Sequence, residues 1–249
     1  MTVTSTSLRR FRHGPGASAR LVCLPHAGGS ASAFRRWRDL LPDDIDLLAV
    51  QYPGREDRYT DPFATDIGKL ADELVVALAV HMDRPLLLFG HSMGASIAYE
   101  VALRLERRGT LCAGLVVSAH PPPHRQRESD LYLQDDDALV ADVRRLADQR
   151  PSLLDDPEAR SLFLPMLRAD YRLIETYRRA IPVPLQTPID MVLPVDDGEI
   201  TRDEALAWQD LSLSPLTLHD VEGGHFYLQR HPEALIERLL PRLKPTVTP

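Results

Sequence analysis

The stretch Leu86-Leu87-Leu88-Phe89-Gly90-His91-Ser92-Met93-Gly94-Ala95 decides the fold of this chain. An apolar run ends in a turn that carries one serine, and an amphipathic helical pattern begins directly after it. A short apolar run followed by glycine is typical of a buried strand in a parallel sheet. The stretch therefore predicts a strand, a sharp turn and a helix, with Ser92 at the turn.

Ser92 has a glycine two residues before it and another two residues after it, Gly90 and Gly94. A tight strand-to-helix turn crowds both positions, so each must be as small as glycine. The turn also leaves the first N–H groups of the helix without intrahelical partners, where they favour a developing oxyanion. We therefore predict Ser92 as a nucleophile and the Met93 N–H as an oxyanion donor. Because glycine and serine are common, this motif needs support from its context.

The composition is that of a globular enzyme. The 249 residues suit one α/β domain with an insertion. The 29 basic and 36 acidic residues give a net charge of −7, which argues against nucleic acid as a partner. The longest apolar run, Leu74 to Val80, is too short to span a membrane, and residues 1–20 lack the apolar core of a signal peptide. We expect a cytoplasmic monomer without a membrane partner.

Strand and helix patterns alternate on both sides of the central stretch. Strands are expected at 20–24, 45–51, 114–119, 189–193 and 216–221, and residues 1–18 form a mobile lead-in or an edge strand. Helices are expected from Phe34 to Leu41, from Thr65 or Asp66 onward, from Ala95 to Gly109, from Thr201 to Asp210 and from Pro232 onward. This alternation predicts an α/β fold with a mainly parallel sheet and helices on both faces.

From His120 to Pro184 the alternation stops. Three helical patterns follow one another without a strand, at Asp137–Gln149, Asp156–Leu164 and Pro165–Arg179. Their apolar faces are too large for solvent-exposed helices, and insertions at the carboxyl edge of such sheets face the site. We therefore predict a core of residues 1–120 and 185–249 and a helical lid of residues 121–184. The alternative is a structural layer without a gating role.

A serine nucleophile needs a neutral imidazole to take its proton and a carboxylate to orient that imidazole. Of the nine histidines, His225 fits this role because it lies in a glycine-flanked loop directly after an expected strand. The adjacent Asp196 and Asp197 follow the preceding strand, and only one of them can face His225. We favour Asp197 and keep Asp196 as the alternative. The order Ser, Asp, His is that of α/β-hydrolases.

A glycine-rich loop, Pro25 to Ser30, follows the first expected strand of the parallel sheet. Its small residues let backbone N–H groups approach a ligand, and we expect the Ala27 N–H to be the second oxyanion donor. The loop lacks the ending of a phosphate-binding motif, so a nucleotide site is not expected. No histidine pair has metal-site spacing, so no metal is expected. Cys23 and Cys112 lie among apolar residues and are expected to be reduced core thiols.

Four segments of the chain resemble, in the same order, those of the type II thioesterases that accompany modular polyketide and nonribosomal peptide synthetases. They are Leu24-Pro25-His26-Ala27-Gly28-Gly29-Ser30-Ala31, Gln51-Tyr52-Pro53-Gly54-Arg55-Glu56, Gly90-His91-Ser92-Met93-Gly94-Ala95 with Ala98-Tyr99-Glu100, and Gly223-Gly224-His225-Phe226-Tyr227. The resemblance implies an α/β-hydrolase core, a helical lid and hydrolysis of acyl groups from the phosphopantetheine arm of carrier proteins. The substrate then carries the phosphopantetheine, and the enzyme needs no cofactor.

Residue by residue, the resemblance implies Ser92 as nucleophile, His225 as base and the N–H groups of Ala27 and Met93 as oxyanion donors. The acid segment Pro194-Val195-Asp196-Asp197 lacks the glycine usual in the family, but its last position matches. The residues assign Arg55 and Glu56 no role beyond a loop ion pair.

Acyl or peptidyl carrier proteins and small acyl thioesters are the expected binding partners. Carrier proteins are usually acidic and this chain is net negative, so docking needs a local basic patch. Arg35, Arg36, Arg38, Arg125 and Arg127 are candidates, and a solvated helix face is the alternative. The competing functions are a general esterase, a chain-terminating or cyclising thioesterase, and an inactive hydrolase fold used for binding.

Overall fold

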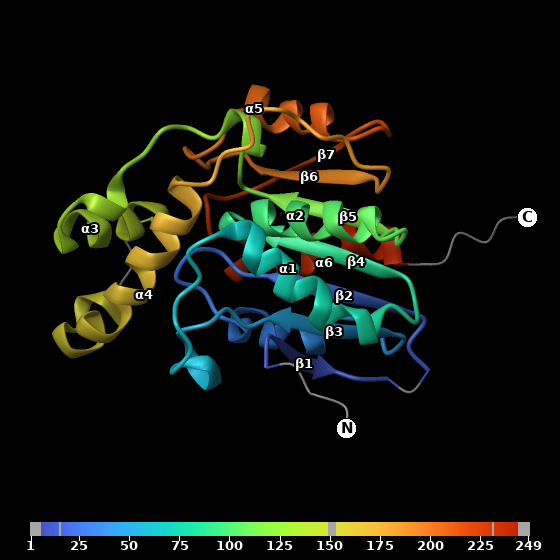
Figure 1. Cartoon of the computed structure of the whole chain (residues 1–249), viewed down its shortest axis with the longest axis horizontal. Coiled ribbons are helices and arrows are strands. Elements are labelled where there is room, and N and C mark those ends of the chain that lie inside the picture. The colour runs from blue at the N-terminus through green and yellow to red at the C-terminus, as the bar shows by residue number, and fades with distance from the viewer. Residues whose placement is uncertain (1–5, 15, 149–152, 231, 244–249) are drawn as a thin grey trace, which may run out of the picture.

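A seven-stranded sheet forms the centre of the computed structural model, which describes residues 6–14, 16–148, 153–230 and 232–243 (Figure 1). The strands are β1 (Leu8–Arg12), β2 (Ala19–Leu24), β3 (Ile45–Val50), β4 (Leu86–His91), β5 (Gly114–Ser118), β6 (Ile189–Pro194) and β7 (Thr217–Val221). Their order is β1-β3-β2-β4-β5-β6-β7; β1 is antiparallel to β3, and all other neighbours are parallel. The mainly parallel sheet expected from the sequence is confirmed, and residues 8–12 form its edge strand.

Helices cover both faces of this sheet (Figure 1). The α-helices are α1 (Ile67–Leu78), α2 (Met93–Arg107), α3 (Asp136–Leu146), α4 (Pro157–Glu175), α5 (Arg202–Leu206) and α6 (Pro232–Leu243). Helices α1 and α2 share one apolar core with the sheet, while α6 and the 3-10 helix η1 (Ala31–Asp39) share the other. No helix in the described part of the chain is long and apolar enough to cross a membrane.

The central strand β4 supplies side chains to both cores. Leu86 and Leu88 belong to the core under α1 and α2, whereas Leu87 and Phe89 belong to the core under α6. All six residues of β4 are buried. Strand side chains alternate between faces, so β4 is fixed from both sides and its carboxyl end is a rigid base for the turn that follows.

Helices α3 and α4 come after β5 and before β6 in the chain. They project from one end of the sheet, at the left of Figure 1. The described residues between 121 and 184 contain no strand. An apolar cluster joins the two helices, formed by Leu139, Val140, Leu154, Leu164, Leu167 and Tyr171. The end expected for the first of these helices, at Gln149, lies outside the described residues. We refer to residues 121–184 as the helical insertion.

The expected helix boundary at Pro165 is wrong, because α4 runs through this proline without a break. A proline inside a helix removes one hydrogen bond and normally ends or kinks the helix. Leu164 and Leu167, on either side of it, are buried in the same apolar cluster. Their burial outweighs the lost bond. Two other expected helices differ in type: the segment near Phe34 is the 3-10 helix η1 throughout, and α5 continues as a 3-10 helix from Ala207 to Leu211.

Candidate active site

Ser92 sits at the turn between β4 and α2 with φ 53° and ψ −124°, a conformation that non-glycine residues rarely adopt. A Cβ atom on Gly90 would overlap the backbone of Gly94. A Cβ atom on Gly94 would overlap the carbonyl of Leu24 and lie 2.7 Å from the carbonyl oxygen of Pro25. Both glycines are therefore needed for the close approach of backbone segments, as expected from the motif.

His225 connects Ser92 to Asp197. Its Nε2 lies 3.0 Å from Ser92 Oγ, and its Nδ1 lies 2.8 Å from Asp197 Oδ2. Asp197 and His225 are buried, whereas Ser92 is partly exposed, so the nucleophile is accessible and the two supporting groups are shielded. Asp196 is exposed and makes no hydrogen bond or ion pair with His225 among the described residues. Of the two aspartates left open by the sequence, the structure thus places Asp197 on the histidine.

The pairing of β6 with β7 positions the acid beside the base. The Val195 N–H donates to the carbonyl of Val221 at 2.9 Å, and the Asp196 N–H donates to the carbonyl of Gly223 at 3.1 Å. The ladder thus continues past the end of β6 into the loop that carries Asp197. Asp197 Oδ1 also accepts the N–H of Glu199 at 3.0 Å, which fixes the carboxylate.

The two residues with the expected oxyanion donors, Ala27 and Met93, line the same cavity as Ser92. Met93 is the first residue of α2, so its N–H has no partner within the helix. Ala27 lies in the loop after β2, and its N–H has no acceptor among the described residues. Two unpaired backbone N–H groups beside a nucleophile are the components of an oxyanion hole.

The glycine-rich loop at Ala27 is held by a second loop, residues 51–56. The Tyr52 hydroxyl donates to the carbonyl of Pro25 at 3.0 Å, and Gln51 Oε1 accepts the Ala31 N–H at 3.1 Å. The expected loop ion pair is wrong: Arg55 pairs with Asp170 of α4, and Glu56 accepts a hydrogen bond from Ser30. The sequence gives no signal for Asp170, which lies 115 positions after Arg55 in a helical pattern.

Three further histidines surround His225 and have lowered pKa values: His91, which is buried, and His26 and His120, which are partly exposed and line the cavity. Desolvation, followed by the charge of His225, lowers the pKa of His26 to about 3 and that of His120 to about 4. The same causes, in the same order, hold the pKa of His91 well below its usual value. His91 Nδ1 lies 3.0 Å from the Ser118 hydroxyl, so that ring nitrogen is turned away from the nucleophile. His225 is thus the histidine that contacts Ser92.

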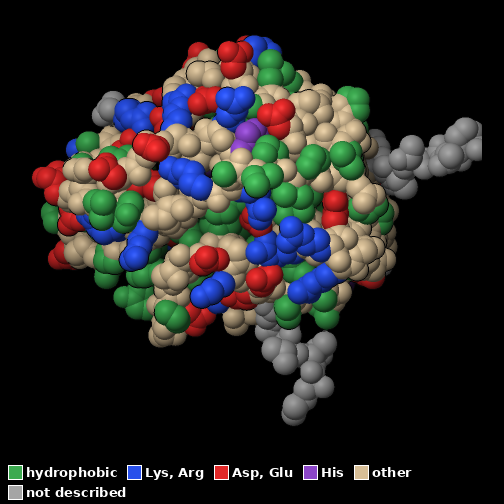
Figure 2. Space-filling view, turned by 45° about the horizontal axis from the view of Figure 1, so that its top comes forward, with side chains coloured by type: hydrophobic (Ala, Val, Ile, Leu, Met, Phe, Trp, Pro, Cys, Tyr) green, Lys and Arg blue, Asp and Glu red, His purple; other side chains and the backbone are tan. Residues whose placement is uncertain are grey.

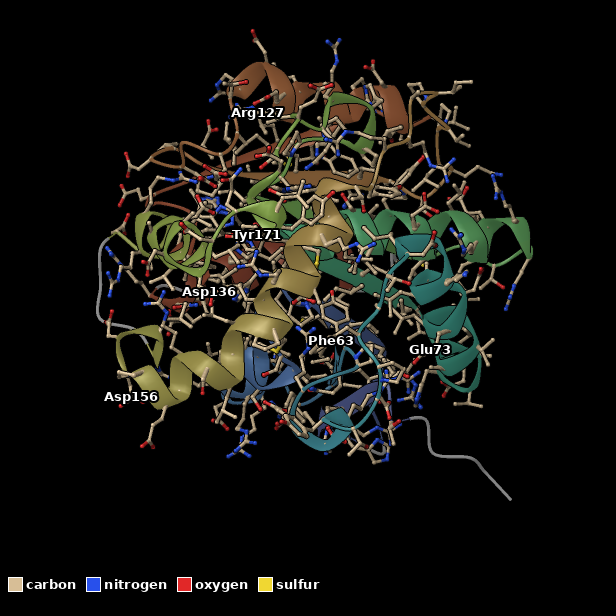
Figure 3. The ribbon with its side chains drawn as sticks, turned by 60° about the vertical axis from the view of Figure 1, so that its left-hand side comes forward. Phe63, Glu73, Arg127, Asp136, Asp156 and Tyr171 are labelled. Atoms are coloured by element: carbon tan, nitrogen blue, oxygen red, sulfur yellow. The ribbon has the colours of Figure 1, made fainter. Side chains whose placement is uncertain are left out.

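A cavity of about 490 Å³ opens above Ser92, which is a volume typical of small-molecule sites. The sheet side supplies the reacting residues and the oxyanion donors. The helical insertion supplies a mainly apolar wall, which includes Leu131, Val143, Leu146, Leu154, Phe163, Met166, Leu167 and Ile174. Figure 3 shows α4 crossing the molecule from Asp156 at its outer end to Tyr171 near the centre. The sequence predicted the insertion but not which of its side chains line the cavity.

A serine, an aspartate and a histidine in this chain order, at the carboxyl ends of the strands of a mainly parallel sheet, define a serine hydrolase with the α/β-hydrolase fold. The chain belongs to the thioesterase family: the family's thioesterase domain matches residues 19–243.

Three similar proteins narrow this assignment. A probable cadicidin biosynthesis thioesterase of Streptomyces griseus is 37% identical over 238 residues, which are 96% of this chain and 66% of that protein. Thioesterase PikA5 of Streptomyces venezuelae is 39% identical over 223 residues, which are 89% of this chain and 79% of that protein. The solved structure of the type II thioesterase BorB from the borrelidin biosynthetic cluster superposes with a TM-score of 0.90 at 39% identity, over 98% of this chain and all of that one. The resemblance to type II thioesterases is confirmed.

Proposed function

We propose that this chain is a serine thioesterase that hydrolyses acyl groups from the phosphopantetheine arm of acyl or peptidyl carrier proteins. Its role is to remove aberrant or stalled chains during polyketide or nonribosomal peptide synthesis. The observation that carries this proposal is the hydrogen-bonded series Asp197, His225 and Ser92, which ends at an apolar cavity of about 490 Å³. The relatives named as thioesterases of such pathways support it.

The first half of the reaction transfers the acyl group to Ser92. His225 Nε2 takes the hydroxyl proton, and Oγ attacks the thioester carbonyl carbon. The N–H groups of Ala27 and Met93 bind the oxygen as its negative charge develops. The carbon–sulfur bond then breaks, and the thiol leaves with the proton from His225. Because a thiol has a pKa of about 8.5, it leaves more readily than an amine.

The second half releases the acid. A water molecule gives a proton to His225 and attacks the acyl carbonyl, and the ester bond to Ser92 breaks as the serine regains its proton. Asp197 holds the imidazole in the tautomer that both steps need. The enzyme supplies backbone dipoles, a base and an orienting acid, so we propose that it needs no cofactor or metal of its own.

We propose that the helical insertion acts as a lid that binds the acyl chain. Its side chains form the apolar wall of the cavity, opposite the reacting residues. Apolar surface removed from water at this wall would favour a hydrocarbon chain by roughly 25 cal/mol per Å². The pantetheine arm would then reach Ser92 through the mouth of the cavity, with the carrier protein outside.

Carrier docking is proposed at exposed arginines near the site. Figure 2 shows positive and negative side chains interspersed over one face of the molecule, so a docking patch must be local. Arg35 and Arg36 are exposed on η1 and have no carboxylate partner among the described residues, whereas Arg38 pairs with Asp39. Arg127 lines the cavity but is paired with Glu204. Arg125 is also exposed and has no carboxylate partner among the described residues. Among the candidates, Arg35, Arg36 and Arg125 are therefore the most available to an acidic carrier.

Reversing the charge of Arg35 and Arg36 to Glu tests this docking site. We expect KM for an acyl-carrier substrate to rise about tenfold, because exposed charge pairs steer association. KM for a small soluble thioester should stay unchanged, and the same reversal at the distant, exposed Arg107 is the matched control. Equal effects on both substrates would count against docking here.

A panel of substrates with one acyl group tests the proposed function. Turnover of an acyl-carrier, an acyl-pantetheine and an oxygen ester is compared at equal concentrations. We expect kcat/KM to be highest for the carrier and lowest for the oxygen ester. A preference for the oxygen ester would indicate a general esterase, a cyclic product would indicate a chain-terminating enzyme, and no turnover would indicate a binding protein.

We also propose a cytoplasmic, monomeric protein. All reacting residues come from one chain, which makes a partner subunit unnecessary for the chemistry. Light scattering on the purified protein would test the monomeric state.

A further inference from the structure

Arg55 and Asp170 form a buried ion pair between the loop after β3 and helix α4. The guanidinium meets the carboxylate through two hydrogen bonds, Nη1 to Oδ2 and Nη2 to Oδ1, both 2.7 Å. Each side chain is only 5% exposed. A pair removed from water in this way is tolerated when its remaining hydrogen-bonding groups are also satisfied. Here two further hydrogen bonds of the pair reach the glycine-rich loop, and Arg55 Nε donates to the carbonyl of Pro53 at 3.4 Å.

The pair forms hydrogen bonds to the two residues of the glycine-rich loop that follow the expected oxyanion donor Ala27. Asp170 Oδ2 accepts the Gly28 N–H at 2.8 Å, and Arg55 Nη1 donates to the carbonyl of Gly29 at 2.8 Å. Gly28 has φ +76°, and a Cβ atom there would lie 2.9 Å from Leu167 of α4. The peptide next to Ala27 is therefore held by Asp170 of α4 and by Arg55, and a side chain at Gly28 would crowd Leu167.

The neighbouring charged residue of α4, Arg168, makes its polar contacts away from this loop. Arg168, two residues before Asp170, donates to the carbonyls of Tyr132 and Gln134 and pairs with Asp136, all within the insertion. Figure 3 shows Asp136 on the insertion side of α4, while the segment that carries Phe63 passes beside the other side of the helix. Arg168 thus joins α4 to the rest of the helical insertion, whereas Asp170 binds the glycine-rich loop.

We propose that Arg55 and Asp170 are positioning residues that hold the Ala27 N–H against the thioester oxygen. The part of α4 around Asp170 is then a fixed support of the oxyanion hole and does not move with a lid. The inference rests on the proposed function, because it takes Ala27 as an oxyanion donor. The pairing with Arg55 also has an electrostatic purpose: it cancels the carboxylate charge, which would otherwise oppose the developing oxyanion.

A double replacement separates positioning from folding. Arg55→Met or Asp170→Leu alone leaves an unpaired buried charge and should lower both Tm and kcat. The double variant Arg55→Met/Asp170→Leu removes both charges, so Tm should recover. Gly28 and Gly29 still lose their partners, so kcat for a small thioester should stay about 10²-fold below wild type with KM unchanged.

Two further variants complete the comparison. Asp170→Asn keeps the shape of the side chain and one acceptor for the Gly28 N–H, so its kcat should lie between wild type and the double variant. Arg168→Gln removes a charge from the same helix without touching the loop, and its kcat should equal that of wild type.

Binding of an alkyl boronic acid, which forms a tetrahedral adduct with a catalytic serine, provides a second readout. Its affinity should fall in the double variant in proportion to kcat/KM, because both depend on the oxyanion donors. A thioether analogue of the substrate, which has no developing oxyanion, should bind wild type and variant equally.

Recovery of both Tm and kcat in the double variant would overturn the positioning role. A rise in KM with unchanged kcat would overturn it as well. Wild-type turnover in the same assay tests the proposed function separately: if wild type is active and the double variant is equally fast, the positioning role alone fails.

Discussion

At the scale of single residues, the site depends on which carboxylate meets His225. The sequence offers two adjacent aspartates, and local pattern cannot separate them because both follow the same strand. The structure separates them through the β6–β7 ladder, which uses the backbone of Asp196 and turns the side chain of Asp197 toward the histidine. A carboxylate at this position fixes the tautomer and stabilises the imidazolium.

Replacing Asp197 with Asn tests this assignment. We expect kcat to fall about 10⁴-fold, because the amide favours the wrong imidazole tautomer. Asp196→Asn changes the neighbouring, exposed residue and serves as the control, with kcat close to wild type. The measurement is steady-state hydrolysis of a small acyl thioester. A larger loss for Asp196→Asn than for Asp197→Asn would reverse the assignment.

At the scale of elements, the turn between β4 and α2 depends on the absence of side chains. The backbone at Leu24 and Pro25 lies against Gly94, so the turn at Ser92 and the start of the glycine-rich loop are packed on each other. The consequence is that a change in this packing affects both stability and activity.

Gly94→Ala should therefore destabilise the protein by about 3 kcal/mol, at the upper end of overpacking effects. A Cβ atom there would meet backbone carbonyls, which cannot rotate away. Gly198→Ala is the matched control, because a Cβ atom at Gly198 has no neighbour within 4 Å. Urea unfolding of both variants measures the difference. Equal stability of the two would show that the turn can relax.

Glu100 of α2 is buried and accepts hydrogen bonds from Tyr177 and Arg179, at the end of the helical insertion. Burial alone would raise its pKa, but hydrogen bonds from Tyr177, Arg179 and Arg104 outweigh burial and lower the pKa. The pKa of a glutamate carboxyl in the unfolded chain is about 4.3. When the pKa in the folded state is lower, the carboxylate stabilises the folded state at pH values above about 4.3. This stabilisation is lost as the pH falls through the pKa of the folded state. The Tm deficit of Glu100→Gln should therefore be full at pH 7 and shrink below about pH 4. A deficit independent of pH would contradict this.

The sequence predicted the strands, most helices, and the loops and turn that place Ser92, His225, Ala27 and Met93 at one cavity, because each of these features is encoded by residues close together in the chain. The catalytic roles of these four residues stay predictions. It did not predict the passage of α4 through Pro165, which depends on tertiary packing of Leu164 and Leu167. Nor did it predict the Arg55–Asp170 pair, because an ion pair between distant segments leaves no local pattern. The features that the sequence did not predict are therefore those that depend on contacts between residues far apart in the chain.

At the scale of the whole molecule, three histidines with lowered pKa values make stability depend on pH. His26, His91 and His120 have lowered pKa values, chiefly through burial. In the unfolded chain each takes up a proton near pH 6.5, whereas the folded state does not. Stability is thus complete above this pH and falls below it.

We expect the free energy of unfolding to fall by about 1.4 kcal/mol per pH unit for each of these histidines between pH 6 and 5. Urea unfolding at several pH values measures the slope. Replacing His91 with Asn should reduce the slope by about a third. A stability that is unchanged from pH 7 to pH 5 would contradict the neutral state of these rings in the folded protein.

The central claim, that Ser92 releases acyl groups from a carrier protein, is tested most directly by intact-protein mass spectrometry of an acyl-loaded carrier. With wild type, we expect the carrier to lose the mass of its acyl group and keep its phosphopantetheine. With a folded Ser92→Ala variant, release should fall by about 10³-fold or more. Release by Ser92→Ala at the wild-type rate would contradict the claim.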